Sequence, residues 1–171
     1  TLNCKDEHYQ SKEANIEVTG GTFVGFDPAN NKAEGVNTSF LPEGYTSTKN
    51  ADGTYTAKKV TYVARIGETR YETLTAAIAA AQNGETVTLL KDVTADITIP
   101  AGKTITLDLN GKKLTVPTDA GILVQGKLTV TGNGTVTCEK TPFMVDAGEL
   151  IIENGAVNSD KDYGIYAKNG G

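Results

Sequence analysis

The sequence predicts an all-β protein whose main part is a right-handed parallel β-helix, a solenoid of stacked coils. Three observations predict this fold: short stretches in which apolar and polar residues alternate, Asn-Gly pairs between these stretches, and the return of the same pattern at a nearly constant interval. The composition agrees, since 19 glycines and no tryptophan in 171 residues are typical of a turn-rich β protein.

The repeat is clearest where the chain is aligned on its Asn-Gly pairs. These pairs stand at 110–111, 133–134 and 154–155, at intervals of 23 and 21 residues. The apolar positions before each turn then coincide, pairing Ile105 and Leu107 with Leu128 and Val130, and these with Leu150 and Ile152. The positions after the turn coincide as well, namely Leu114 and Val116, Val136 and Cys138, and Val157 and Ser159. One coil cannot bury its inward side chains alone, but coils stacked ~4.8 Å apart form a continuous core.

An antiparallel β-sandwich is the alternative fold, because it also consists of short strands with Asn-Gly turns. A sandwich predicts no fixed alignment of inward residues at an interval of 21 to 23 residues. The alignment therefore favours the solenoid, and the rule for parallel crossovers makes it right-handed.

The stretch 63–90 predicts the capped beginning of this solenoid. It indicates a strand, a Gly-Glu turn, a second strand, a short helix from about Thr75 to Gln82, and a third strand. Thr73 or Thr75 is expected to cap the helix, and Asn83-Gly84 to end it in a left-handed conformation. The Ala-rich helix suits a lid, because terminal coils need a cover over their open core.

The stretch RYETLTAAIAAAQNGETVTLLKDVTADITIPAGKTITLDLNGKKLTV, residues 70–116, resembles the first coils of right-handed parallel β-helix repeat proteins with a pectate-lyase-like fold. The resemblance covers residues 63–171 and rests on the Leu-x-x-Ala-Ile helix, G-E-T-V-T-L and T-I-T-L-D-L-N-G. It implies a surface protein or adhesin of gut bacteria, or a phage structural protein. Because the same fold carries lyases, hydrolases, adhesins and tail fibres, it does not imply one activity.

Residues 1–60 are expected to form a separate part before the capped solenoid of 61–171. IEVTGGTF, residues 16–23, is similar to a coil in which Ile16, Val18 and Phe23 point inward. An irregular stretch, 24–44, and a β-hairpin with its turn at Asn50–Gly53 are expected to follow. This order suggests the closing coil of one solenoid followed by the start of another.

The sequence predicts no assembled catalytic site. In the family that the chain resembles, pectin-cleaving members use a cluster of acidic residues to hold Ca²⁺, and a basic residue, typically Arg, to take the proton. The only two arginines here, Arg65 and Arg70, are expected in the capping hairpin and not on the coils. The lysines of the coils, at 103, 112, 113 and 127, fall in turns or at outward positions, where Lys is normally solvated. Glycoside hydrolysis needs two carboxylates ~5 to 9 Å apart. Asp108, Asp146 and Glu149 are candidates, with Asp108 and Asp146 expected on one face, although outward acids are by default solvated.

Metal binding has two weak candidates, and no cofactor is expected. Asp160 and Asp162 in NSDKDYG could ligate Ca²⁺, but the spacing fits no known loop and a charged turn is the simpler interpretation. His8 has no Cys or His partner at ligand spacing. Cys4 and Cys138 are interpreted as small apolar inward residues, with a disulfide between them left open.

The charge and the aromatic residues narrow the choice of partners. A net charge of −5 argues against nucleic acid, and no apolar run reaches membrane-spanning length. Surface glycans remain as an external ligand, because exposed aromatic rings stack on the faces of pyranose sugars. Tyr55 and Tyr163 are expected to be exposed, whereas most of the other tyrosines are expected to cover the solenoid ends or the hairpin.

Two functional classes follow from these observations. The first is a non-enzymatic structural or adhesive module of an extracellular protein on a cell or virion surface. The second is a polysaccharide-processing β-helix enzyme, or a fragment of one. For the module we expect head-to-tail self-association or tandem repeats, because the chain stops partway through a coil that TLNC would continue, with Leu2 and Cys4 at the Leu150 and Ile152 positions. The expected interface comprises Leu2, Cys4, Ile16, Val18, Phe23, Ile165 and Tyr166.

Overall fold

The computed structural model describes residues 6–11, 15–31, 38–117, 121–161 and 163–170. The chain divides into two compact units, Thr1–Thr61 and Tyr62–Gly171. Each unit has a hydrophobic cluster of its own, and each is treated by itself below.

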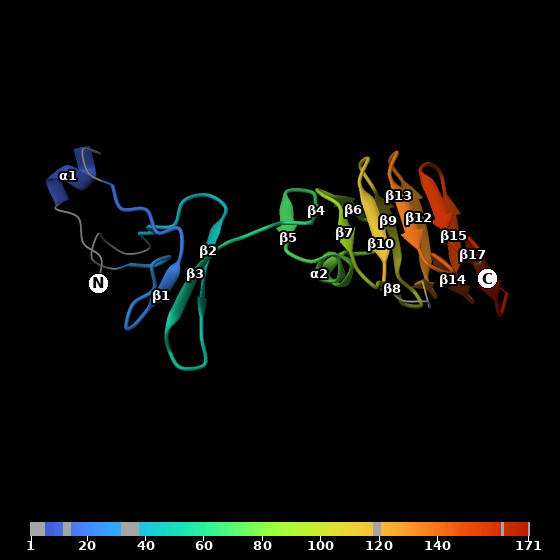
Figure 1. Ribbon diagram of the computed structural model, residues 1–171, viewed down its shortest axis with the longest axis horizontal. Helices are drawn as coiled ribbons and strands as arrows, with labels where there is room; N and C mark the ends of the chain where they lie inside the picture. The colour runs from blue at the N-terminus through green and yellow to red at the C-terminus, as the bar shows by residue number, and fades with distance from the viewer. Residues whose placement is uncertain (1–5, 12–14, 32–37, 118–120, 162, 171) are drawn as a thin grey trace. The chain divides into compact units, whose positions relative to one another are not determined.

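Unit 1 is built on a small antiparallel sheet (Figure 1). Its strands lie in the order β1-β3-β2, where β1 is Gly21–Phe23, β2 is Tyr45–Lys49 and β3 is Tyr55–Lys59. The expected hairpin is confirmed: Gly53 donates its amide to the carbonyl of Asn50 at 3.0 Å and has a φ of +83°, which glycine adopts without strain. A short helix, α1 (Asp6–Ser11), precedes the sheet; its sequence DEHYQS shows no apolar periodicity, and we did not predict it.

The stretch 16–23 does not form a parallel coil within unit 1. Its last three residues form β1, which runs antiparallel to β3, and Val18 lies in the core of unit 1 with Phe40 and Ala57. The amide of Val18 donates to the carbonyl of Phe40 at 2.8 Å. The alternating pattern indicated a strand, and within unit 1 this strand pairs with β3 of the hairpin while Val18 packs against Phe40 and Ala57.

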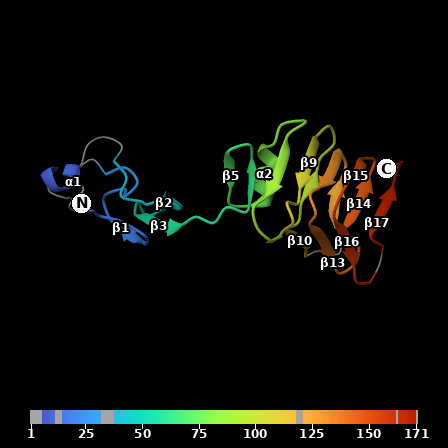
Figure 2. The same ribbon diagram turned by 90° about the horizontal axis from the view of Figure 1, so that it is seen from above.

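Unit 2 is a parallel β-solenoid of four coils, which Figures 1 and 2 show stacked side by side. Each coil contributes one strand to each of three sheets. The first sheet contains β6 (Thr86–Leu89), β9 (Thr104–Asp108), β12 (Lys127–Thr131) and β15 (Glu149–Ile152). The second contains β7 (Val93–Thr94), β10 (Lys113–Val116), β13 (Thr135–Cys138) and β16 (Ala156–Ser159). The third contains β8 (Thr98–Ile99), β11 (Ile122–Val124), β14 (Phe143–Asp146) and β17 (Ile165–Lys168).

The predicted register is confirmed in both sheets for which it was stated. Leu128 pairs with Ile105 on one side and Leu150 on the other, and Val130 pairs with Leu107 and Ile152. The second sheet aligns the predicted residues too, as the columns Leu114–Val136–Val157 and Val116–Cys138–Ser159. Inward residues of the inner coils are buried almost completely; Leu107, Leu114, Leu128 and Val136 have no exposed surface.

The first coil is covered by the predicted cap. The hairpin of β4 (Ala64–Ile66) and β5 (Thr69–Tyr71) pairs antiparallel with β6, and helix α2 (Leu74–Ala80) buries Leu74, Ala77 and Ile78 against the core. Thr73 is the N-cap, since its hydroxyl accepts a hydrogen bond from the amide of Ala76 at 3.1 Å.

The end of α2 differs from the prediction. The helix stops at Ala80, and Ala81 leaves it in an extended conformation, so the left-handed turn comes later, at Gly84 with a φ of +87°. Beyond the helix, the Glu85 carboxylate accepts a hydrogen bond of 2.7 Å from the backbone amide of Gln82.

The corners between the first and second sheets do not repeat one turn geometry. Asn110 and Gly111 both have positive φ, at 49° and 70°, as predicted for an Asn-Gly turn. At the next corner the positive φ lies at Gly132, and at the third it lies at Gly155. The Asn-Gly pairs therefore mark the corners correctly, but two of the three Asn residues there are not left-handed.

Candidate functional site

The last coil of the solenoid presents three strand edges. Among the described strands, β15 pairs only with β12, β16 only with β13, and β17 only with β14. The edge of a parallel sheet carries unpaired N–H and C=O groups that match a further strand. The end formed by β15, β16 and β17, here called the terminal edge, is therefore a template for one more coil.

The apolar side chains of the terminal edge are less covered than their equivalents one coil earlier. Ile165 is 47% exposed, whereas Phe143, its partner in the preceding coil, is fully buried. Leu150, Ile152 and Val157 are only partly buried, although they continue the columns of the core. Burying the exposed half of Ile165 would contribute about 1 kcal/mol. The terminal edge thus combines unsatisfied backbone groups with apolar side chains in coil register.

Tyr166 belongs to a different surface from Ile165. Residues alternate in direction along β17, so Ile165 continues the inward column of Phe143 and Tyr166 the outward column of Met144. Tyr166 is 45% exposed, and its ring lies 6.4 Å from that of Tyr163, which is 65% exposed. The two residues predicted at the interface are therefore neighbours in sequence, but only Ile165 lies at the open core.

Three polar residues near these tyrosines connect the last coil to the coil before it. Asp146 pairs in register with Lys168, and its carboxylate accepts a hydrogen bond of 2.6 Å from the Asn169 side chain. The Lys168 ammonium lies 3.4 Å from the same carboxylate. The hydrogen bond from Asn169, and secondarily the charge of Lys168, hold the pKa of Asp146 below its usual value. Asp146 is therefore ionised at neutral pH and ties β17 to β14.

The other residues predicted at the interface lie in unit 1 or outside the described residues. Val18 is 6% exposed in the core of unit 1, and Ile16 and Phe23 pack against that core. Val18 is thus not available to another coil unless unit 1 opens. Leu2 and Cys4 fall outside the described residues, so their role stays a prediction.

The basic residues lie where the sequence places them. Arg65 and Arg70 face each other across the β4–β5 hairpin; Arg65 donates to the carbonyl of Gly67 at 2.9 Å, and Arg70 lies 6.0 Å from the ring centre of Tyr62. On the first sheet, Lys127 forms a 3.0 Å ion pair with Glu149 of the next coil. Lys103 donates to the carbonyl of Ala79 at 3.0 Å and so binds the C-terminal end of α2.

The carboxylate pair considered for glycoside hydrolysis does not assemble. Asp108 lies on β9 and Asp146 on β14, in different sheets, so the expectation that they share a face is wrong. The alignment on the Asn-Gly pairs covered two strands of each coil and did not include the third strand, on which Asp146 lies. Asp108 accepts the Asn110 amide at 2.8 Å, which gives it a role in the corner turn.

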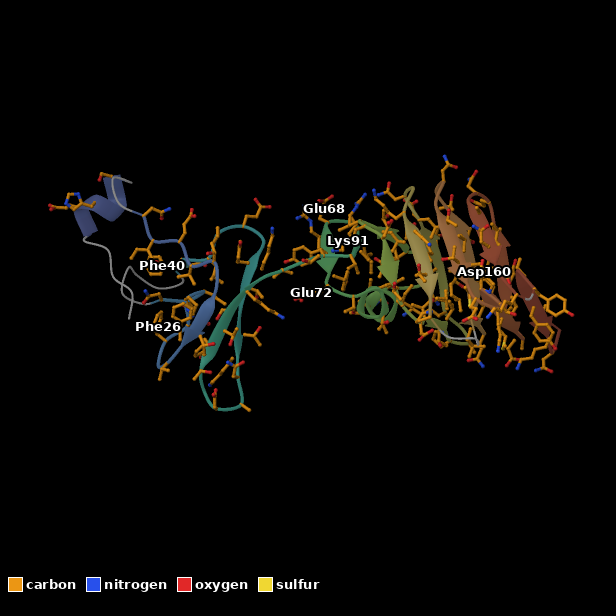
Figure 3. The ribbon with its side chains drawn as sticks, in the orientation of Figure 1. Phe26, Phe40, Glu68, Glu72, Lys91 and Asp160 are labelled. Carbon is orange, nitrogen blue, oxygen red and sulfur yellow. The ribbon has the colours of Figure 1, made fainter. Side chains whose placement is uncertain are left out.

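Only one of the two metal candidates, Asp160, lies within the described residues. Asp160 is exposed after β16, and Asp162 lies outside the described residues. Figure 3 shows Asp160 on the last coils, whereas Glu68, Glu72 and Lys91 lie at the capped end of unit 2. His8 is exposed on α1, with Nε2 3.6 Å from the Glu7 carboxylate. Within the described part of the chain, no group of three His, Cys, Asp or Glu residues has metal-binding geometry.

The structure also describes one of the two cysteines. Cys138 is buried at an inward position, as expected of a cysteine used as a small apolar residue, whereas Cys4 falls outside the described residues. In the part of the chain that the structure describes, no helix is long and apolar enough to cross a membrane.

Sequence reasoning missed an outward apolar column on the third sheet. Leu123, Met144 and Tyr166 occupy equivalent outward positions on β11, β14 and β17. The sequence contained a signal for this column in the runs ILV (122–124), FMV (143–145) and IYA (165–167), each with three apolar residues in a row. Side chains alternate along a strand, so when the outer two residues face the core the middle one faces away from it.

The chain was compared with protein-family models, curated proteins and solved structures, and none of the three comparisons found a match.

Proposed function

We propose that the chain is a non-enzymatic structural or adhesive module of an extracellular protein on a cell or virion surface. In this proposal its solenoid is extended at the terminal edge by another coil, supplied by a neighbouring subunit or by the next stretch of a longer tandem polypeptide. One observation carries the proposal. The last coil has three unpaired strand edges, and its apolar residues continue the inward columns of the core but are only partly covered, namely Leu150, Ile152, Val157 and Ile165.

The donor that fits best is the segment TLNC at residues 1–4. Leu2 and Cys4 have the spacing of Leu150 and Ile152, and Cys138 shows that this solenoid accepts a cysteine at an inward position. This donor leaves out Ile16, Val18 and Phe23 of the interface expected from the sequence, because these three residues pack in or against the core of unit 1. A contact between the start of one chain and the end of another does not close on itself, so repeated copies form a fibre.

The test is the dependence of self-association on the two ends. Sedimentation velocity of the 171-residue chain over a wide concentration range should show growing oligomers. Deleting residues 1–5 should abolish them, because the donor is lost while the described core of unit 1 stays intact. Ile165→Lys should also abolish them, since a charge at the open core opposes a following coil.

The matched control is Thr129→Lys, which adds the same charge at an outward position of the inner strand β12. It should assemble like the unaltered chain. If the unaltered chain remains a monomer at the highest concentration, or if Thr129→Lys weakens assembly as much as Ile165→Lys does, association through the terminal edge between subunits is wrong.

A further inference from the structure

The third sheet carries an apolar column on its solvent side that the core does not require. Leu123 and Met144 are half-buried and Tyr166 is 45% exposed, while their strand neighbours Ile122 and Phe143 point inward and are fully buried. In the first sheet the equivalent outward column is Thr86–Thr106–Thr129–Ile151, which is apolar only in the last coil. In the second sheet the column is polar throughout, as Thr94–Thr115–Thr137–Asn158. The polar columns show that stacking of the coils does not require apolar residues at outward positions.

Two tyrosine rings enlarge this column at its end. Tyr163 and Tyr166 have ring centres 6.4 Å apart and planes inclined by 33°, so they form a shallow angled surface instead of a closed stack. Their exposed fractions are 65% and 45%, and they are two of the four large apolar side chains most exposed in the described residues. Exposed aromatic groups of this kind are typical of binding surfaces.

Ordered polar groups lie beside the apolar column. Asp146 and Lys168 are two residues beyond Met144 and Tyr166 on the same strands, and therefore on the same outward side. The side chain of Asn169 is fixed by its 2.6 Å hydrogen bond to Asp146. The carboxylate, the amide oxygen, and the ammonium protons not used within this group leave both acceptors and donors for a ligand.

We propose that this outward surface, formed by Leu123, Met144, Tyr163 and Tyr166 with Asp146, Lys168 and Asn169 beside them, binds a neutral polysaccharide. The apolar face of a pyranose ring lies on the tyrosine rings, and its hydroxyl groups exchange hydrogen bonds with the polar groups. Hydroxyls both donate and accept, which matches the mixture of groups present. We name this surface the tyrosine face.

The size and charge of the tyrosine face favour a neutral sugar over other partners. Three rungs ~4.8 Å apart give a column only about 10 Å long, which is small compared with the ~800 Å² per partner of a stable protein interface. An anionic glycan is disfavoured, because Asp146 neutralises Lys168 and the chain carries a net charge of −5. The tyrosine face is also separate from the terminal edge, which uses inward side chains and backbone groups.

The experiment is affinity electrophoresis of the 171-residue chain in native gels containing hydroxyethyl cellulose, xyloglucan, galactomannan or yeast mannan, with polygalacturonate as the anionic comparison. We expect at least one neutral polysaccharide to retard the chain and polygalacturonate not to do so. Tyr163→Ala and Tyr166→Ala should each weaken the apparent affinity at least tenfold. Tyr166→Phe should keep most of it, because the ring is retained.

Val24→Ala is the matched control, since Val24 is 81% exposed in unit 1 and reports on unspecific apolar adhesion. It should bind like the unaltered chain. Thermal unfolding should show that the two Ala variants remain folded, which is expected because neither ring lies in the buried core. Sedimentation velocity should show that they still self-associate as the unaltered chain does.

Each other outcome contradicts the inference. If no neutral polysaccharide retards the chain, or retardation survives both Ala substitutions, the tyrosine face is not a sugar-binding surface. If Tyr166→Ala changes sedimentation and not retardation, the face contacts protein instead. If the unaltered chain does not self-associate but is retarded by a neutral polysaccharide in the predicted way, the sugar-binding inference stands and only the proposed head-to-tail contact is refuted.

Discussion

Gly134 stands where two coils approach too closely for any other residue, and its replacement by Ala tests how the coils are held together. A Cβ atom at this position would lie 2.2 Å from the carbonyl oxygen of Lys112 and 2.5 Å from the Cβ of Leu109. The φ of Gly134 is not in the left-handed region, so the cost of the substitution is steric and does not come from backbone strain.

The magnitude follows from what has to move. Reaching an ordinary contact distance of about 3.4 Å requires the two coils to separate by more than 1 Å at this corner, roughly a quarter of the ~4.8 Å rung spacing. That shift strains the hydrogen bond of 3.0 Å from the Thr135 amide to the same Lys112 carbonyl. Overpacking costs about 1 to 3 kcal/mol and a lost buried hydrogen bond about 1 kcal/mol more. We expect the free energy of unfolding of unit 2 to fall by about 3 kcal/mol.

Substitutions at two other glycines separate the steric cost of close approach from the cost of backbone conformation. Gly111→Ala, at the same corner one coil earlier, introduces a positive-φ residue at +70° with nothing within 4 Å of the new Cβ, and should cost about 1 to 2 kcal/mol. Gly164→Ala meets no atom closer than 3.8 Å and has no positive φ. It should be neutral, or stabilise by about 0.5 kcal/mol through the unfolded state.

Thermal unfolding followed by far-UV circular dichroism measures all three variants. At about 4 °C per kcal/mol, Gly134→Ala should lower the Tm of unit 2 by about 12 °C, Gly111→Ala by about 4 to 8 °C, and Gly164→Ala hardly at all. The reasoning is refuted if Gly134→Ala changes the Tm no more than Gly164→Ala does. A larger loss for Gly111→Ala than for Gly134→Ala would show that backbone conformation, and not close approach of the coils, dominates at the corners.

Two further predictions concern the ends of unit 2. Thr73→Ala should destabilise unit 2 by about 1 kcal/mol, because it removes the hydroxyl that accepts a hydrogen bond from the amide of Ala76, whereas Thr73→Ser should keep the stability. Chemical denaturation measures both variants, and equal midpoints for the two would contradict the capping role. The last coil should loosen in acid, because the folded state holds the pKa of Asp146 below 3.8; its stabilisation is fully present above pH 3.8 and lost as the pH falls through the lowered pKa. Hydrogen exchange of the β17 amides should therefore show lost protection in acid beyond that of the inner strands, and Asp146→Asn should remove this difference; unchanged acid sensitivity in that variant would exclude the carboxylate as its cause.

The parts of the fold that could be predicted are those in which neighbouring coils determine each other. Leu128 packs between Ile105 and Leu150, about 22 residues away on either side, and the repeat in the sequence states that relation directly. Unit 1 has no such repeat. Val18 packs against Phe40 and Ala57, and nothing periodic in the sequence connects these three positions. Its alternating pattern indicated a strand, but the partner and the direction of pairing depend on contacts that only the folded unit defines.

The same contrast explains which residues of the solenoid carry information about function. Inward residues such as Leu128 are fixed by stacking, and the register predicts them whatever the protein does. Outward residues are not constrained in this way, and threonine satisfies the strand at most of these positions. An apolar residue kept outward in three successive coils, as at Leu123, Met144 and Tyr166, is therefore not explained by the fold. Stacking already accounts for the inward columns, so we expect contacts with other molecules at the outward positions that depart from threonine.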